Sequence, residues 1–157
     1  MKEKELNIQT PDGLMTTFVT VPEENGPHPI ILFLMDAPGK REELHDMARR
    51  FATVGYYVML PNLYYRTSND FVSDFSEKSR VIQRQHMAAL NQQMVVNDCK
   101  VLIQYTAEDR DAKDGPIGCV GYCMSGPFAF AAASQISNRI RASASIHGVN
   151  LCNGSKD

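Results

Sequence analysis

The first two apolar stretches of the chain alternate with polar residues, and a short turn sequence separates them. Residues 4–10, KELNIQT, and residues 14–21, LMTTFVTV, flank PDG at residues 11–13. Alternation with a period of two is typical of strands, and Pro, Asp and Gly are residues that tight turns favour. The pattern predicts a β-hairpin at the start of the chain, and we expect both of its strands to be edge strands.

Later apolar stretches are the candidates for the remaining strands. PIILFLM, residues 29–35, is a continuous apolar run of the kind buried on both faces of a parallel sheet, and it is expected to be a central strand. The other candidates are YYVMLP at residues 56–61, PIGCVGYC at residues 116–123 and RASASIHGV at residues 141–149. Four strands are therefore expected after the hairpin.

Patterns typical of helices lie between these runs. Apolar residues recur at helical spacing within residues 41–55, and Gly55 is a natural helix end. A tract from about residue 77 to residue 106 follows mostly helical intervals, and its length leads us to expect a break within it. A further helix is expected after Ser125 and Gly126.

Strands and helices therefore alternate after the N-terminal hairpin. This order predicts a three-layer α/β fold with a mostly parallel sheet, right-handed crossovers and an antiparallel hairpin at its start. The chain has 157 residues, of which 43% are hydrophobic, enough to bury a sizeable core. No internal repeat or interdomain linker is evident, so residues 1–157 are expected to form a single domain.

The balance of charged residues and the number and spacing of cysteines argue against several classes of partner and site for this chain. Lys and Arg number 16 against 18 Asp and Glu, without a long run of one sign, so nucleic acid and anionic membranes are not expected partners. No apolar stretch of signal-peptide or membrane-spanning length occurs, which predicts a cytoplasmic protein. The four cysteines lack the paired spacing of zinc sites and are few for a disulfide framework. We expect reduced thiols, no metal and no cofactor.

The stretch GYCMSG, residues 121–126, lies where a strand is expected to pass directly into a helix. Such a junction places its middle residue on a strained turn and lifts that side chain toward the helix N-terminus. Gly121 and Gly126 let the helix and the strand pass closely. The helix dipole favours a thiolate at Cys123, and the N–H of Met124 is placed to bind a substrate carbonyl oxygen. The pattern predicts a nucleophile elbow.

Four stretches in order, FLMDAPG, GYYVMLPNLYYR, GYCMSG and SIHGV, resemble the dienelactone hydrolase family of α/β-hydrolases over nearly the whole chain. The resemblance implies an α/β-hydrolase-like fold and hydrolysis of small-molecule carboxylic esters or lactones. It implies that Cys123 is the nucleophile and that the backbone N–H groups of Ala37 and Met124 bind the oxyanion. It also places Asp36 where the family often carries an acidic residue near the resting thiol, a position from which Asp36 would tune the nucleophile.

The sequence departs from the family pattern in two places. Ser125 stands where the resembling elbows usually have glycine, and a residue this small should preserve the turn with some added crowding. The chain also stops after SIHGVNLCNGSKD, whereas the family's aspartate and histidine come from later strands and loops. Whether it is a fragment or a genuinely short protein, we expect it to lack the last strands and helices of the fold. We also expect it to be weak or inactive by itself.

Several other residues are candidates for supporting roles. His147 closes the last expected strand at the edge where active sites of α/β sheets gather, so it lines the pocket or acts as a substitute base. Arg66 and Arg84 either contact a substrate carboxylate or lie on a solvated helix face. Tyr64 lines the pocket mouth or anchors a loop.

The remaining titratable residues are expected to have no catalytic role. His28, His45 and His86 are interpreted as solvated surface residues. Asp98 belongs to a set of acidic residues that form no paired-carboxylate or metal arrangement, and surface charge is its expected role. Cys119 is expected to be a core thiol.

Two further functions stay open beside the hydrolase. A non-catalytic module would keep the carbonyl or carboxylate pocket for binding, and a redox-sensitive protein would use the accessible thiolate of the elbow. A buried structural thiol at Cys123 is the alternative to all of these. The last strand is expected to leave an unpaired edge and an uncovered face, so the chain should be marginally stable and prone to self-association or aggregation.

Overall fold

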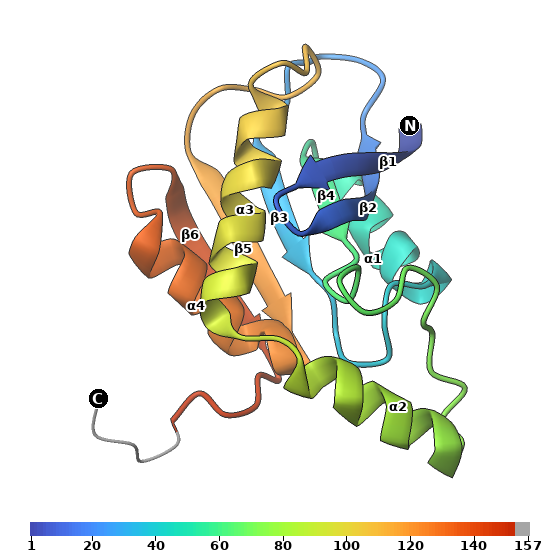
Figure 1. The fold of residues 1–157 in the computed structure, drawn as a ribbon. Helices are drawn as coiled ribbons and strands as arrows, with labels where there is room; N and C mark the ends of the chain where they lie inside the picture. Colours follow the sequence, from blue (N-terminus) through green and yellow to red (C-terminus); the bar gives the residue numbers. More distant parts are fainter. Residues whose placement is uncertain (153–157) are drawn as a thin grey trace.

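The computed structural model describes residues 1–152 as a mixed sheet with helices on both faces (Figure 1). The strands are β1 (Lys2–Thr10), β2 (Gly13–Val21), β3 (Ile30–Leu34), β4 (Tyr57–Pro61), β5 (Ile117–Tyr122) and β6 (Ile140–Ile146). The helices are α1 (Glu42–Thr53), α2 (Glu77–Ala88), α3 (Gln92–Thr106) and α4 (Gly126–Gln135), with the short 3-10 turn η1 (Cys123–Ser125) before α4. The strand order β1-β2-β4-β3-β5-β6 confirms the predicted α/β fold class.

The N-terminal hairpin forms as predicted, but only its first strand lies at an edge. β1 and β2 pair antiparallel from Lys2 opposite Val21 to Thr10 opposite Gly13. β2 also pairs with β4, so the expectation of two edge strands is wrong for β2. From Met15 onward nearly all residues of β2 are buried, and apolar or β-branched residues of this kind pack well between two neighbours.

Parallel pairings build the centre of the sheet. β3 lies between β4 and β5, and β5 pairs in turn with β6. All residues of β3 and β4 are buried, which confirms that PIILFLM supplies a central strand. Parallel strands end at the same edge of a sheet, so the segments that follow β3, β4, β5 and β6 meet there. In Figure 1 the arrowheads of β3 and β5 point toward this edge, on the side where α2 lies.

Helix α1 covers one face of the sheet, and α3 and α4 cover the other. Gly121 of β5 faces α4, because a Cβ atom there would lie 3.0 Å from that of Ala129. The next residue, Tyr122, faces the other way, and its ring meets the Phe33 ring edge-on at 4.9 Å. Phe33 in turn lies 6.0 Å from Phe51 of α1. α3 packs beside α4 (Figure 1), which completes the three layers.

The long helical tract is broken between α2 and α3, as expected. The side chains of Ser76 and Asn91 accept hydrogen bonds from the N–H groups of Ser79 and Met94, at 3.2 and 2.9 Å. These N-caps satisfy donors at the two helix starts. The cap at Asn91 lies where the chain changes direction between the two helices. Helix α3 runs along the sheet, whereas α2 projects beyond it (Figure 1).

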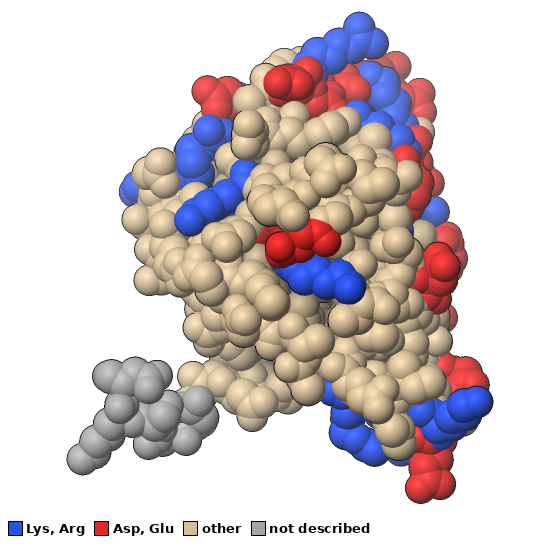
Figure 2. Space-filling model, in the orientation of Figure 1, with Lys and Arg blue, Asp and Glu red and all other residues tan. Residues whose placement is uncertain are grey.

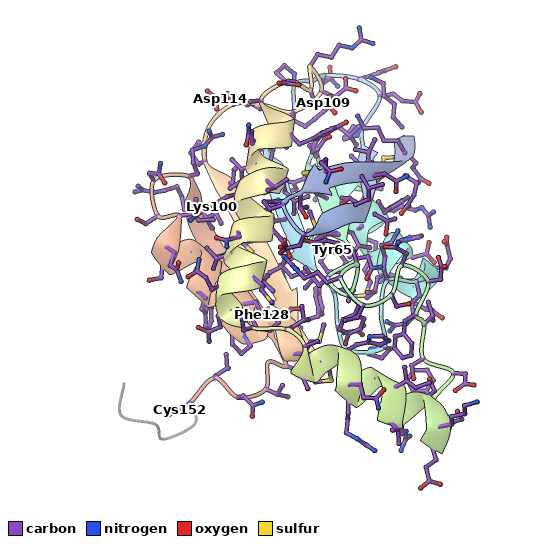
Figure 3. The ribbon with its side chains drawn as sticks, viewed as in Figure 1. Tyr65, Lys100, Asp109, Asp114, Phe128 and Cys152 are labelled. Carbon is purple, nitrogen blue, oxygen red and sulfur yellow. The ribbon has the colours of Figure 1, made fainter. Side chains whose placement is uncertain are left out.

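A buried ion pair ties α3 to the loop after β4. The Asp98 carboxylate accepts two hydrogen bonds from Arg66, at 2.7 and 2.9 Å, and one from the Tyr65 hydroxyl at 3.0 Å. Arg66 also binds Asp12 at the hairpin tip, at 2.7 Å. Figure 3 labels Tyr65 between the hairpin and α3. The side chain of Asp98 is only 1% exposed, so its expected surface role is wrong, and the bidentate arginine is what permits burial of the charge.

β6 forms the second edge of the sheet. Among the described residues it has a hydrogen-bonded neighbour on one side only, and Ile140 is the one buried residue of the strand. On the α1 face, an apolar groove of about 450 Å³ lies over β5 and β6 and is lined in part by Phe51, Tyr122 and Ala144. Within residues 1–152, both the expected unpaired edge and the expected uncovered face are present.

Charged side chains of both signs are distributed over the surface. On the face in Figure 2, Lys and Arg lie among Asp and Glu, mostly around the margin. Some are paired, such as Lys2 with Asp111 and Arg139 with Asp114, each at 2.9 Å. None of the helices in the described residues is both long and apolar enough to cross a membrane.

Candidate active site

β5 passes into α4 through a sharp turn at Cys123. The strand ends at Tyr122, η1 begins at Cys123 and α4 starts at Gly126. The φ angle of Cys123 is +53°, in the left-handed region that residues other than glycine rarely adopt. Its thiol is free and partly exposed. Such a turn lifts the side chain away from the strand at the carboxyl edge of the sheet, which is the geometry of a nucleophile elbow.

Two glycines make this turn possible. A Cβ atom at Gly121 would lie 2.0 Å from the backbone oxygen of Ser125. One at Gly126 would lie 2.2 Å from Oγ of Ser145 and 2.8 Å from Cα of Gly148. Distances this short are not tolerated between non-bonded atoms, so α4 approaches β5 and the segment after β6 only because both positions lack a side chain.

Hydrogen bonds join the segments that carry the two expected oxyanion donors. Ala37 and Met124 are both buried, the first after β3 and the second in η1. The Tyr64 hydroxyl lies 2.9 Å from the carbonyl oxygen of Ala37 and 3.2 Å from the sulfur of Met124. Ser125 donates through Oγ to the carbonyl of Met35 at 2.5 Å. The loop after β3 is therefore fastened to the elbow at two points.

Tyr64 anchors a loop, which was one of its two expected roles, and does not line the pocket mouth. Its side chain is inside the protein, with 1% of the residue exposed. Burial raises the pKa of Tyr64 well above its usual value, and Asp36 and Cys123 raise it further. The hydroxyl therefore stays protonated at neutral pH and can keep donating its hydrogen bond.

Asp36 lies at the same edge, but its carboxylate is bound to Arg41 at 2.6 and 3.0 Å. Hydrogen bonding to Asp36 raises the pKa of Arg41, so this partner stays charged at neutral pH. After burial, Asp36 is the next largest cause of the raised pKa of Tyr64. Sequence reasoning missed Arg41, although an arginine five residues after the acid was an available signal.

His147 follows β6 at this edge of the sheet. Its φ angle is +42°, it is exposed, and its ring centroid lies 6.0 Å from that of Tyr122 in an edge-on contact. The N–H of Val149 donates to the carbonyl of Cys123 at 3.1 Å. The segment after β6 is therefore held against the elbow, with His147 within that segment.

The two arginines expected near a substrate differ in their surroundings. Arg66 lies in the loop after β4, where Asp98 and Asp12 occupy its guanidinium, so neither substrate contact nor a solvated helix face describes it. Burial lowers the pKa of Arg66, but the hydrogen bonds to these carboxylates outweigh burial and raise it overall. Arg84 is exposed on α2, on a solvated helix face, which was one of its two expected surroundings.

The expectation of three solvated histidines is wrong. His28 is buried in the loop before β3. His45 is partly buried and stacks on Phe18, with ring centroids 4.1 Å apart. His86 stacks on Tyr64 at 5.1 Å, and burial lowers the pKa of His86. The rings that cover His45 and His86 come from distant parts of the chain, so local sequence gave no signal of these contacts.

The other thiols are separate from this site. Cys99 and Cys119 are buried, and a hydrogen bond with Cys119, followed by burial, raises the pKa of Cys99. The burial of Cys119 confirms its expected core position. Cys152 is exposed, and Figure 3 shows it on the segment after β6. In the described part of the chain, no three potential metal-ligating side chains come together.

Two curated proteins of similar sequence are considerably longer than the region they share with this chain. A relative from Methylorubrum extorquens is 26% identical over 122 residues, which cover 78% of this chain and 41% of that protein. The carboxymethylenebutenolidase of Pseudomonas putida is 25% identical over 131 residues, which cover 83% of this chain and 55% of that protein. The chain thus spans about half the length of the curated relatives it matches.

Solved structures share the fold. A crystal structure from Klebsiella pneumoniae matches with a TM-score of 0.80 at 20% identity, over 99% of this chain and 62% of the other. The dienelactone hydrolase of Anabaena variabilis matches with a TM-score of 0.70 at 15% identity, over 94% and 63%. The model of the dienelactone hydrolase family matches residues 15–156, nearly the whole sequence. The chain therefore belongs to the dienelactone hydrolase family.

Proposed function

We propose that this chain carries the nucleophile and the oxyanion site of a hydrolase acting on small carboxylic esters or lactones. The observation that carries the proposal is the left-handed backbone of Cys123, with φ of +53°, at the turn from β5 into α4. A strained turn that presents a partly exposed thiol at the carboxyl edge of a sheet suits nucleophilic catalysis. Membership of the dienelactone hydrolase family supports ester chemistry.

The geometry supports a thiol acylation step. The Cys123 thiolate attacks the carbonyl carbon, a C–S bond forms, and the carbonyl oxygen takes the displaced electron pair. The N–H groups of Ala37 and Met124 bind this oxyanion. When the carbonyl re-forms, the ester C–O bond breaks, and the alkoxide leaves with that electron pair and takes a proton from water. The product is a thioester, which a second attack by water converts to the acid and the free thiol.

We further propose that release of the acyl group is slow in the 157-residue chain. Release needs a base that takes a proton from water, and histidine bases are ordinarily oriented by a carboxylate. In the part of the chain that the structure describes, the exposed ring of His147 packs against Tyr122 and forms no hydrogen bond with a carboxylate. The chain alone should therefore accumulate a thioester or turn over weakly.

Cys123→Ala should abolish acylation at the elbow, because alanine has no nucleophile. The purified chain is mixed with p-nitrophenyl acetate and followed by intact-protein mass spectrometry, with fragment spectra to locate the acetyl group. Wild type should gain one stable acetyl group at Cys123. Cys152 is exposed and provides the matched control, since Cys152→Ser keeps the elbow thiol and should acylate Cys123 at the wild-type rate.

Three other outcomes of this experiment would contradict parts of the proposal. If Cys123→Ala gains the same adduct at the same rate, the nucleophile assignment is wrong. Many turnovers per chain would contradict the slow release and make His147→Gln the next variant. A folded wild type that gains no adduct would favour a non-catalytic binding module.

We also propose that the 157-residue chain associates with itself through β6. Most of β6 is exposed, its outer edge has no hydrogen-bonded neighbour among residues 1–152, and an apolar groove lies beside it. Ala144→Lys places a charge in that groove and should weaken association at least about tenfold, or about 1.4 kcal/mol. Sedimentation velocity over a concentration series measures this. Ala88→Lys on exposed α2 is the control, and equal effects of the two substitutions would contradict a role for β6.

A further inference from the structure

We infer that Ser125 is a positioning residue for the oxyanion site, acting through the loop after β3 and not on the substrate itself. The inference rests on the proposed function. Ser125 is fully buried, so its hydroxyl must find a partner inside the protein. That partner is the carbonyl of Met35, the residue that follows β3, at 2.5 Å from Oγ. The contact joins residues 90 positions apart in the sequence.

The loop that Ser125 contacts is held along its whole backbone. Every carbonyl from Met35 to Gly39 accepts a hydrogen bond. The Met35 carbonyl accepts from Oγ of Ser125 (2.5 Å), and the Asp36 carbonyl accepts from the Gly39 N–H (3.3 Å). The Ala37 carbonyl accepts from the Tyr64 hydroxyl (2.9 Å). The Pro38 carbonyl accepts from the Ser73 N–H (2.9 Å), and the Gly39 carbonyl accepts from Nη1 of Arg41 (3.0 Å). Ser125 therefore holds the first peptide of a loop that is fixed one peptide at a time.

Fixing this first peptide matters for the direction of the Ala37 N–H. That N–H lies in the same planar peptide as the Asp36 carbonyl. The peptides before and after it are held by Ser125 and Tyr64, respectively. The Gly39 N–H also holds this peptide, through the Asp36 carbonyl at 3.3 Å. Without the Ser125 hydrogen bond, the peptide before it loses its side-chain donor, so rotation about the bonds of Asp36 is less restrained. An oxyanion donor stabilises the transition state only if it already points to where the charge develops, so this freedom should reduce its effect.

Ser125 also connects the two halves of the oxyanion site. It directly follows Met124, whose N–H is the second donor, and its side chain reaches the loop that carries the first. The Tyr64 hydroxyl makes a second connection, between the Ala37 carbonyl and the Met124 sulfur. A glycine at position 125 would fit the turn but would leave the Met35 carbonyl without this donor. The serine thus fixes the spacing of the two N–H groups.

The test compares two reactions of the Cys123 thiol by mass spectrometry. Acylation by p-nitrophenyl acetate passes through an oxyanion, whereas alkylation by iodoacetamide displaces iodide from a saturated carbon and forms none. Ser125→Ala should slow acylation about tenfold, less than the roughly 100-fold or greater loss from removing a donor outright, and should leave alkylation within about twofold. Ser125→Gly should give the same selective loss, which guards against a poor fit of alanine in the turn.

Ser143→Ala is the matched control, because the buried Ser143 hydroxyl has no hydrogen-bond partner among the described residues and both rates should stay unchanged. A selective loss of acylation in both Ser125 variants supports the inference. Unchanged acylation overturns it, and so does equal slowing of both reactions, which would assign the serine to the shape of the elbow alone. A wild type that is alkylated but never acylated overturns the proposed function as well, so the two failures are distinguishable.

Discussion

Gly121→Ala should destabilise the protein by about 3 kcal/mol or more. The new Cβ atom would lie 2.0 Å from the backbone oxygen of Ser125 and 2.5 Å from its carbonyl carbon. Backbone atoms cannot rotate away as a flexible side chain does, so β5 or α4 has to shift. The free energy of unfolding, measured by urea denaturation and far-UV circular dichroism, reports the loss. Acylation of Cys123 should fall with it, because the same shift displaces the elbow.

Gly118→Ala provides the control within the same strand. A Cβ atom at Gly118 would lie 3.5 Å from Cγ1 of Ile31, an ordinary van der Waals distance. The free energy of unfolding should therefore stay within about 0.5 kcal/mol of wild type. Similar losses in the two variants would show that the close approach of α4 to β5 is not what requires glycine at position 121.

Asp98→Ala should cost about 3–5 kcal/mol of stability, the range for removing one partner of a buried ion pair. The Arg66 side chain is only 12% exposed, and the substitution removes both of the hydrogen bonds that it makes to Asp98. The Tyr65 hydroxyl loses an acceptor at the same time. A lowered urea midpoint with an unchanged slope would record this loss.

Two further variants separate the buried charge from the rest of the network. Asp12 is the outer partner of Arg66, and the Asp12 side chain is 51% exposed. Asp12→Ala should therefore lower the free energy of unfolding by less than about 1 kcal/mol. Asp98→Leu combined with Arg66→Met replaces both buried charges and should cost less than Asp98→Ala alone. If Asp12→Ala and Asp98→Ala are equally damaging, burial of the ion pair is not the source of its effect.

The order of the elements could be predicted because local sequence determines it. Alternating residues on both sides of PDG are enough to indicate the hairpin. The length of the helical tract is enough to indicate the break between α2 and α3. The elbow is likewise local, since glycines that flank a cysteine between a strand and a helix indicate the turn at Cys123. Such signals depend on spacing within a few residues.

Pairings between distant residues could not be predicted in the same way. The second neighbour of β2 depends on how the sheet assembles, and the alternation of its residues does not reveal it. Arg66 and Asp98 are 32 positions apart, and composition does not show which of many carboxylates is buried. Arg66, expected on a helix face or at a substrate, and Asp98, expected at the surface, therefore form a buried ion pair between the loop after β4 and α3.

In the candidate site, too, local features could be predicted from the sequence and contacts between distant residues could not. Cys123 was predicted as the nucleophile from its immediate neighbours, whereas the side chains that hold the loops around it come from distant parts of the chain. The Tyr64 hydroxyl reaches Ala37, 27 positions away, and Ser125 reaches Met35 across an even longer separation. Sequence reasoning treated Ser125 as a small residue that the turn tolerates. Its hydrogen bond to Met35 depends on the parallel pairing of β3 with β5, which sequence spacing does not reveal.

The turn at Cys123 follows β5, which is one strand away from the edge that β6 forms in the described part of the sheet. Gly121 and Tyr122, which precede Cys123, pair with Ser145 and Ile146 of β6. An exposed strand with a partner on one side opens locally more often than the centre of a sheet. Each local opening of β6 releases one side of the strand end that holds the thiol. We therefore expect local fluctuations of β6 to limit how long the turn at Cys123 keeps its geometry, at a lower free energy than global unfolding.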